Sequence, residues 1–195
     1  MMKRPFRVAL LALVLAPFAA LPAHAADARV SVTAIVDHPA LDAARQGIVE
    51  ELAAAGYVVG KNLRLDYQSA QGNTATAAQI ARKFVGDRPD VIVAMSTPSA
   101  QTVVAATREI PIVFSAVTDP VAAKLVKSWE ATGGNVTGVS DLPLLDKHLA
   151  LLRQALPTAK RIGVVYNPGE ANSVAAIAQL KKLAQPAGLS VIEGA

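Results

Sequence analysis

The strongest constraint on the fold is an alternation that repeats from about residue 30 onward. Short apolar segments rich in β-branched residues, such as Val91-Ile92-Val93-Ala94-Met95, are followed by longer segments with helical periodicity. Strands are expected at about residues 30–36, 63–67, 91–95, 112–117, 136–140, 161–166 and 189–192. Helices are expected at about residues 39–55, 74–85, 98–107, 120–127, 144–156 and 172–184. Repeated strand–helix units predict an α/β fold with a parallel sheet and helices on both of its faces.

The segment 128–135, which contains Gly133-Gly134, separates two unequal parts of the chain. Residues from about 139 onward supply roughly two strands and two helices, which is little material for an independent hydrophobic core. We therefore expect a first α/β lobe at residues 26–138 and an incomplete second lobe at residues 139–195. The alternative is one compact domain of unusual topology.

The N-terminus has the three parts of an export signal. Basic residues come first (Lys3, Arg4, Arg7), an apolar run follows at 8–20, and small residues end the segment at Ala23 and Ala25. The run is too short to cross about 30 Å of hydrocarbon as a helix, and Pro17 interrupts it. We expect a signal peptide at residues 1–25 that is cleaved after about Ala25. Since the chain has no cysteine for lipid attachment, a periplasmic location is expected.

Composition excludes several classes of function. The chain has 19 Lys and Arg against 15 Asp and Glu, a net charge of +4, but three of the basic residues belong to the signal. The remaining charges are scattered and nearly balanced, which disfavours binding to nucleic acid. The absence of cysteine excludes disulfides, thiol nucleophiles and thiolate metal sites.

Signatures of enzymes are missing. The sequence contains no G-x-S-x-G, P-loop or G-x-G-x-x-G motif. Beyond the signal it has two histidines, His38 and His148, which are far apart in sequence. We expect no catalytic residue, no metal and no cofactor. His38 follows a predicted strand, so it either lines a cleft or caps the next helix.

Polar residues gather in the loops that follow the predicted strands, where parallel sheets bind ligands. Ser96 and Thr97 precede a proline at the first position of a helix, where free N–H groups favour a carboxylate. Asn172-Ser173 repeats this pattern in the later part of the chain. Asp119 could accept an ammonium group, but Ser, Thr and Asp residues also serve as plain helix caps. Donors on some loops and an acid on another suit a zwitterion.

Seven stretches, in order along nearly the whole chain after the signal, resemble one family. They are residues 37–42 (DHPALD), 56–62 (GY to GKN), 70–73 (AQGN), 96–101 (STPSAQ), 117–122 (VTDPVA), 134–141 (GNVTGVSD) and 166–173 (YNPGEANS). The sequence resembles ABC-transporter substrate-binding proteins, whose better-known members bind tryptophan or related amino acids. The resemblance implies the type I periplasmic-binding fold, in which two α/β lobes close on a ligand about a hinge. Family members continue through a full second lobe and return to the first, and we expect the second lobe of this chain to be truncated.

The resemblance also implies a set of ligand-binding residues that line the cleft between the lobes. They are Asp37, His38, Ser96, Thr97, Gln101, Thr118 and Asp119 in the first lobe, and Asn167, Glu170, Asn172 and Ser173 in the second. The ligand carboxylate is expected at Ser96 and Thr97 and the ammonium group at Asp119. Asp141, near the crossover, is either a hinge or a cleft residue.

The implied function is that of the periplasmic solute-binding component of an ABC importer. It would capture a small polar solute, with an amino acid favoured, and release it unchanged. Whether the side chain of that amino acid is aromatic or branched stays open. The expected partners are this ligand and a membrane permease, and the expected state is a monomer. Two alternatives remain: an exported α/β hydrolase that uses Asp37 or Asp119 with His38, and a ligand-binding module that signals to a receptor.

Overall fold

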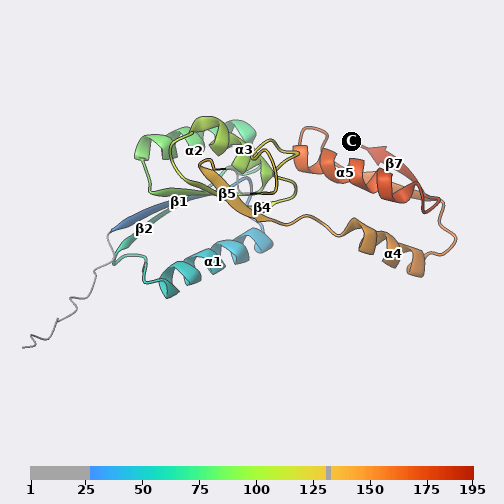
Figure 1. Cartoon of the computed structure of the whole chain (residues 1–195), viewed down its shortest axis with the longest axis horizontal. Coiled ribbons are helices and arrows are strands. Elements are labelled where there is room, and N and C mark those ends of the chain that lie inside the picture. Colours follow the sequence, from blue (N-terminus) through green and yellow to red (C-terminus); the bar gives the residue numbers. More distant parts are fainter. Residues whose placement is uncertain (1–26, 131–132) are drawn as a thin grey trace, which may run out of the picture.

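The computed structural model describes residues 27–130 and 133–195 (Figure 1). The predicted export signal lies outside the described residues. A five-stranded sheet is formed by β1 (Ala28–Ala34), β2 (Leu63–Ser69), β3 (Val91–Met95), β4 (Ile112–Val117) and β5 (Val136–Ser140). The strands pair in the order β2-β1-β3-β4-β5, and every pair is parallel. The predicted parallel sheet is confirmed.

Three helices cover both faces of this sheet, as the sequence predicts. α1 (Pro39–Ala54) lies on one face, and α2 (Thr74–Asp87) and α3 (Thr97–Ala106) lie on the other (Figure 1). The chain places β2 on one side of β1 and then returns to place β3 on its other side. The direction of strand addition therefore reverses between β1 and β3, which is the topological switch point where open α/β sheets bind ligands.

The sheet separates two hydrophobic cores. The larger core lies under α2 and α3 around Phe84, Ile92 and Val103, which are completely buried. The smaller core lies under α1 and includes Val32 and Met95. β3 is buried on both faces, and its sequence is continuously apolar. β1 is also buried, but it carries the buried polar residues Ser31 and Thr33 between its apolar ones. An apolar groove of about 560 Å³ remains beside α1, where that helix leaves part of the sheet uncovered.

The second unit, residues 145–194, consists of α4 (Leu145–Ala155), β6 (Arg161–Val165), α5 (Ala171–Ala184) and β7 (Ser190–Gly194). β6 and β7 form a parallel two-stranded sheet. Its small core contains Leu149, Ala184 and Leu189. The other face of the two strands is open, and Val165 is 88% exposed. None of the helices in the described parts of the chain is both long enough and apolar enough to cross a bilayer.

The predicted helix at about 120–127 is wrong. These residues form a series of turns, because Lys124 has a left-handed backbone with φ of +59° that stops helical propagation. The helix predicted from Asn172 or Ser173 begins at Ala171, with Glu170 in the capping position. The predicted lobe boundary between 138 and 139 falls inside β5, whose pairing with β4 continues to Ser140.

Candidate functional site

The carboxyl ends of the five parallel strands meet at one edge of the sheet. In Figure 1 the strands run from the side where the chain enters toward the side on which α4 and α5 lie. Asp37 and His38 follow β1, Ser96 and Thr97 lie at the end of β3, and Thr118 and Asp119 follow β4. The structure therefore brings these predicted residues of the first unit to a common edge that faces the second unit.

The N-terminus of α3 is the most unusual point of this edge. Ser96, at the cap, has φ of +77° and ψ of 157°, and it makes no side-chain cap hydrogen bond to the residues described. The hydroxyl oxygens of Ser96 and Ser99 are buried and have no hydrogen-bond partner in the described structure. The first helical turn also leaves backbone N–H groups free. This arrangement combines donors and a positive helix end, which suits an anionic group.

A second helix N-terminus, that of α5, lies beside the first. Ala171, its first residue, packs against the core of the first unit, and Figure 1 shows this end of α5 close to α3. The amide of Asn167 donates to the Glu170 carboxylate at 3.1 Å, and the Ser173 hydroxyl lies 3.5 Å from its other oxygen. The side-chain oxygen of Asn172 is buried without a partner among the described residues. Asn167, Glu170 and Ser173 are thus linked by hydrogen bonds at the N-terminus of α5, and Asn172 lies in the same first turn.

The loop after β4 uses its polar residues to hold its own shape. One carboxylate oxygen of Asp119 accepts the backbone N–H groups of Val121 and Ala122, both at 2.9 Å. The amide of Gln101 donates to the carbonyl oxygen of Ala123 at 3.1 Å, which ties this loop to α3. Asp119 therefore caps its turn.

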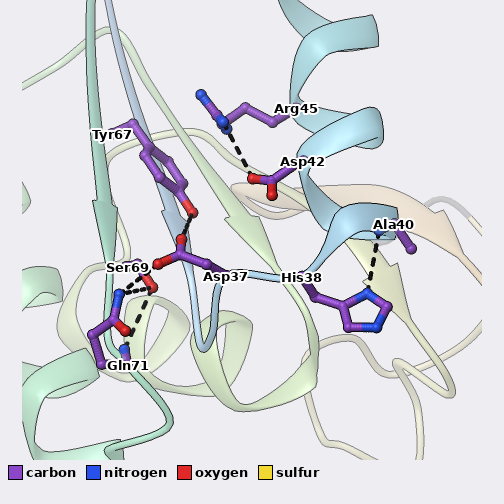
Figure 2. Close-up of polar contacts among 8 residues, drawn as sticks. All are labelled: Asp37, His38, Ala40, Asp42, Arg45, Tyr67, Ser69 and Gln71. Atoms are coloured by element: carbon purple, nitrogen blue, oxygen red, sulfur yellow. Dashed lines mark hydrogen bonds and ion pairs between the residues drawn. The ribbon is translucent and has the colours of Figure 1, made fainter.

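The corner between β1 and β2 contains a polar cluster that the sequence did not reveal (Figure 2). The Tyr67 hydroxyl donates to one oxygen of Asp37 at 2.7 Å, and the Gln71 amide donates to the other at 2.5 Å. The Gln71 amide also lies 3.0 Å from the Ser69 hydroxyl. His38 caps α1, since its Nδ1 accepts the N–H of Ala40 at 3.2 Å. Of the two roles considered for His38, the structure shows the cap.

These hydrogen bonds set the charge states in the corner. The bond from Tyr67, followed by that from Gln71, holds the pKa of the Asp37 carboxyl below its ordinary value. Burial, with the bond to Asp37, raises the pKa of Tyr67 to about 12. At neutral pH the pair is therefore a carboxylate with a neutral phenol as its donor.

Backbone strain is concentrated at the same edge. Gln71, Ser96 and Ala116 have φ values of +52°, +77° and +52°. They stand at or near the carboxyl ends of β2, β3 and β4. Such conformations cost a non-glycine residue roughly 1–3 kcal/mol and are found preferentially at binding and catalytic sites. Within the described chain there is no group of three or more His, Asp or Glu residues that could hold a metal ion.

Comparison with known proteins identifies the family. Residues 29–195 match the family model for ABC transporter substrate binding protein. A tyrosine-binding protein of Clostridioides difficile (strain R20291) is 46% identical over 164 residues, which are 84% of this chain and 48% of that protein. The chain thus spans about half the length of this curated relative.

Solved structures agree with this assignment. A conserved domain protein from Vibrio cholerae is 56% identical with a TM-score of 0.85, and the alignment covers 86% of this chain and 57% of that one. An ABC domain in complex with L-Trp from Streptococcus pneumoniae is 34% identical with a TM-score of 0.83, covering 87% and 57%. More distant periplasmic binding proteins share the fold, which confirms the predicted type I architecture. The chain belongs to the family of ABC transporter substrate-binding proteins.

Proposed function

We propose that this chain is the solute-binding component of an ABC importer, exported to the periplasm, and that it binds an amino acid at the carboxyl edge of its sheet. The observation that carries the proposal is the set of buried, unpartnered polar atoms at two adjacent helix N-termini. They are the hydroxyls of Ser96 and Ser99 and the side-chain oxygen of Asn172. Buried polar atoms normally have a partner, so a polar ligand between α3 and α5 would supply the missing hydrogen bonds.

The ligand carboxylate is assigned to the N-terminus of α3. Ser96 and Thr97 offer hydroxyls there, together with free backbone N–H groups at the positive end of the helix. Hydrogen bonds to a charged group contribute about 1.5–3 kcal/mol each. In this proposal Asn172, Ser173 and Glu170 of the second unit bind the ligand from the N-terminus of α5.

The ammonium group is assigned to an acid at the same edge. Asp37 and Asp119 follow β1 and β4, the strands on either side of β3. A zwitterionic ligand whose carboxylate lies at Ser96 would thus have an acidic side chain of the protein in the loop on each side. Both acids are kept in the proposed ligand set with His38, Thr118 and Gln101.

An aromatic amino acid is the favoured class of ligand. The relatives support this choice, since one is a tyrosine-binding protein and another was solved with L-Trp. Closure of the two lobes about a hinge near Asp141, docking on a membrane permease and function as a monomer complete the proposal. A sensory role remains the second candidate and would involve the same ligand site.

Calorimetry on the chain tests the proposal. We expect L-tyrosine or L-tryptophan to bind, and the corresponding amine without the carboxylate to bind at least tenfold more weakly. Ser96→Ala should weaken binding of the amino acid to a similar degree. Ser190→Ala is the matched control, because the Ser190 hydroxyl bonds the Lys160 carbonyl at the far end of the second unit.

Two results would contradict the proposal. Equal binding of the amino acid and its amine would contradict the assignment of the ligand carboxylate to the N-terminus of α3. Recovery of a chemically altered ligand by mass spectrometry would favour the hydrolase instead. The hydrolase has little support, because the Nδ1 atom of His38 is already an acceptor in the cap of α1.

A further inference from the structure

Asp37 is an exposed carboxylate that is held on both of its oxygens. Tyr67, in β2, donates to one oxygen, and Gln71, in the loop after β2, donates to the other (Figure 2). Each carboxylate oxygen can accept about two hydrogen bonds, so each retains capacity for a further donor. The carboxylate is therefore fixed in direction before any ligand arrives.

The two donors are themselves held in place. The Arg45 guanidinium lies 4.3 Å from the centre of the Tyr67 ring and pairs with Asp42 at 3.2 Å. Gln71 adopts a left-handed backbone with φ of +52°, and its amide also meets the Ser69 hydroxyl. The Gln71 amide thus reaches Asp37 from a backbone conformation that is costly for a non-glycine residue.

The position of Asp37 favours it over Asp119 as the partner of an ammonium group. β1 and β3 are neighbours, with Ala34 paired to Met95, so the loops that carry Asp37 and Ser96 flank the switch point. One oxygen of Asp119 is engaged by two backbone N–H groups of its own turn. Asp37, in contrast, is exposed. It accepts its hydrogen bonds from the side chains of Tyr67 in β2 and Gln71 in the loop after β2.

We infer that Tyr67 and Gln71 are positioning residues that hold the Asp37 carboxylate as the acceptor for the ligand's ammonium group. The inference rests on the proposed function as an amino-acid-binding protein. It adds Tyr67 and Gln71 to the determinants of the site and names Asp37, rather than Asp119, as the residue that distinguishes an amino acid from a simple carboxylic acid.

The charged groups around this corner are few. Asp37 faces Tyr67 and Gln71 from the β2 side, and Arg45 and Asp42 face Tyr67 from α1. His38 is adjacent in sequence but turns toward its own helix. Because the Tyr67 hydroxyl lowers the pKa of Asp37, its removal raises that pKa. Ammonium binding that needs the carboxylate is then lost at a higher pH.

The experiment compares Tyr67→Phe with the unchanged chain, using L-tryptophan and its deaminated analogue, indole-3-propionate, as probes. Calorimetry is run from about pH 3 to pH 7. Tyr67→Phe should weaken L-tryptophan binding about two- to tenfold at neutral pH and shift the acidic loss of affinity to higher pH. Indole-3-propionate should bind both chains equally. Gln71→Leu should act in the same direction.

Controls separate positioning from folding. Tyr57→Phe removes a hydroxyl from another partly buried tyrosine, under α1, and should leave both ligands unaffected. Asp37→Asn should cost L-tryptophan at least tenfold, more than Asp119→Asn does. The thermal midpoint of Tyr67→Phe, whose ring still packs in the same core, checks that the fold persists.

The outcomes distinguish the inference from the proposed function. If L-tryptophan and its analogue weaken equally in Tyr67→Phe, or if Asp119→Asn is the more damaging change, the inference is overturned and the amino-acid site remains. If the unchanged chain binds no amino acid, the proposed function fails, and the inference fails with it.

Discussion

Substitution of Ser96 by glycine should stabilise the free protein and weaken its binding of ligand. The Ser96 backbone has φ of +77° and ψ of 157°, a region that is essentially restricted to glycine. A side chain held there costs about 1–3 kcal/mol. The buried, unpartnered hydroxyl of Ser96 adds a desolvation cost of about 1–3 kcal/mol. Glycine removes both costs.

The opposing term is smaller. Glycine loses more conformational freedom on folding, which costs roughly 0.5–1 kcal/mol. The net stabilisation is then about 3 kcal/mol, or an increase of about 6–12 °C in Tm for a chain of this size. Ser96→Ala is the matched variant, since alanine removes the hydroxyl but retains the strained Cβ atom.

Thermal unfolding and urea denaturation of the three chains measure these effects. We expect the order of stability to be glycine, then alanine, then serine at position 96. Both variants should bind an amino acid more weakly, because both lack the hydroxyl. A Ser96→Gly chain no more stable than Ser96→Ala would refute the argument that the Ser96 backbone is strained.

Three further predictions concern the first unit. A Cβ atom on Gly138 would lie 2.1 Å from the carbonyl oxygen of Phe114, so Gly138→Ala should lower the free energy of unfolding by about 1–3 kcal/mol in urea denaturation. Asp119→Ala should cost about 0.5–1.5 kcal/mol through loss of the hydrogen bonds from the Val121 and Ala122 N–H groups, and Asp119→Asn, which keeps an acceptor oxygen, should recover most of it. The hydrogen bond from Lys83 lowers the pKa of Asp87, so its contribution is present above the ordinary value of 3.8 and is lost as the pH falls through the lower folded value. Lys83→Met should therefore flatten the decline of stability that urea series show as the pH falls through and below about 3.8.

The centre of the sheet could be predicted because β3 is buried on both faces. The segment Val91–Met95 has no polar residue, and it forms β3 over the predicted residues. The helix predicted after Pro120 failed because an acid followed by proline begins turns as well as helices. The structure is needed to see that the Asp119 side chain closes a turn. It is also needed to see that Lys124 has a left-handed backbone, which a helix does not allow.

The site was predicted from the rule that parallel sheets bind ligands at the carboxyl ends of their strands. This rule selects only residues that follow strands. It selected Asp37 and Ser96 because they come directly after strands. It missed Tyr67, which lies inside β2 and meets Asp37 only because β2 pairs with β1. The order of strands in the sheet was needed to find this contact, and a sequence pattern does not supply that order. The ligand roles assigned to the site residues stay predictions.

The two-stranded β6–β7 sheet has a consequence for which part of the chain unfolds first. Two strands with one small core and an open apolar face are marginally stable on their own, and Val165 is almost fully exposed. Residues 145–194 should therefore unfold and refold as a separate cooperative unit while the five-stranded sheet stays folded. Proteases will cut first in this part of the chain and leave the first unit as a resistant fragment.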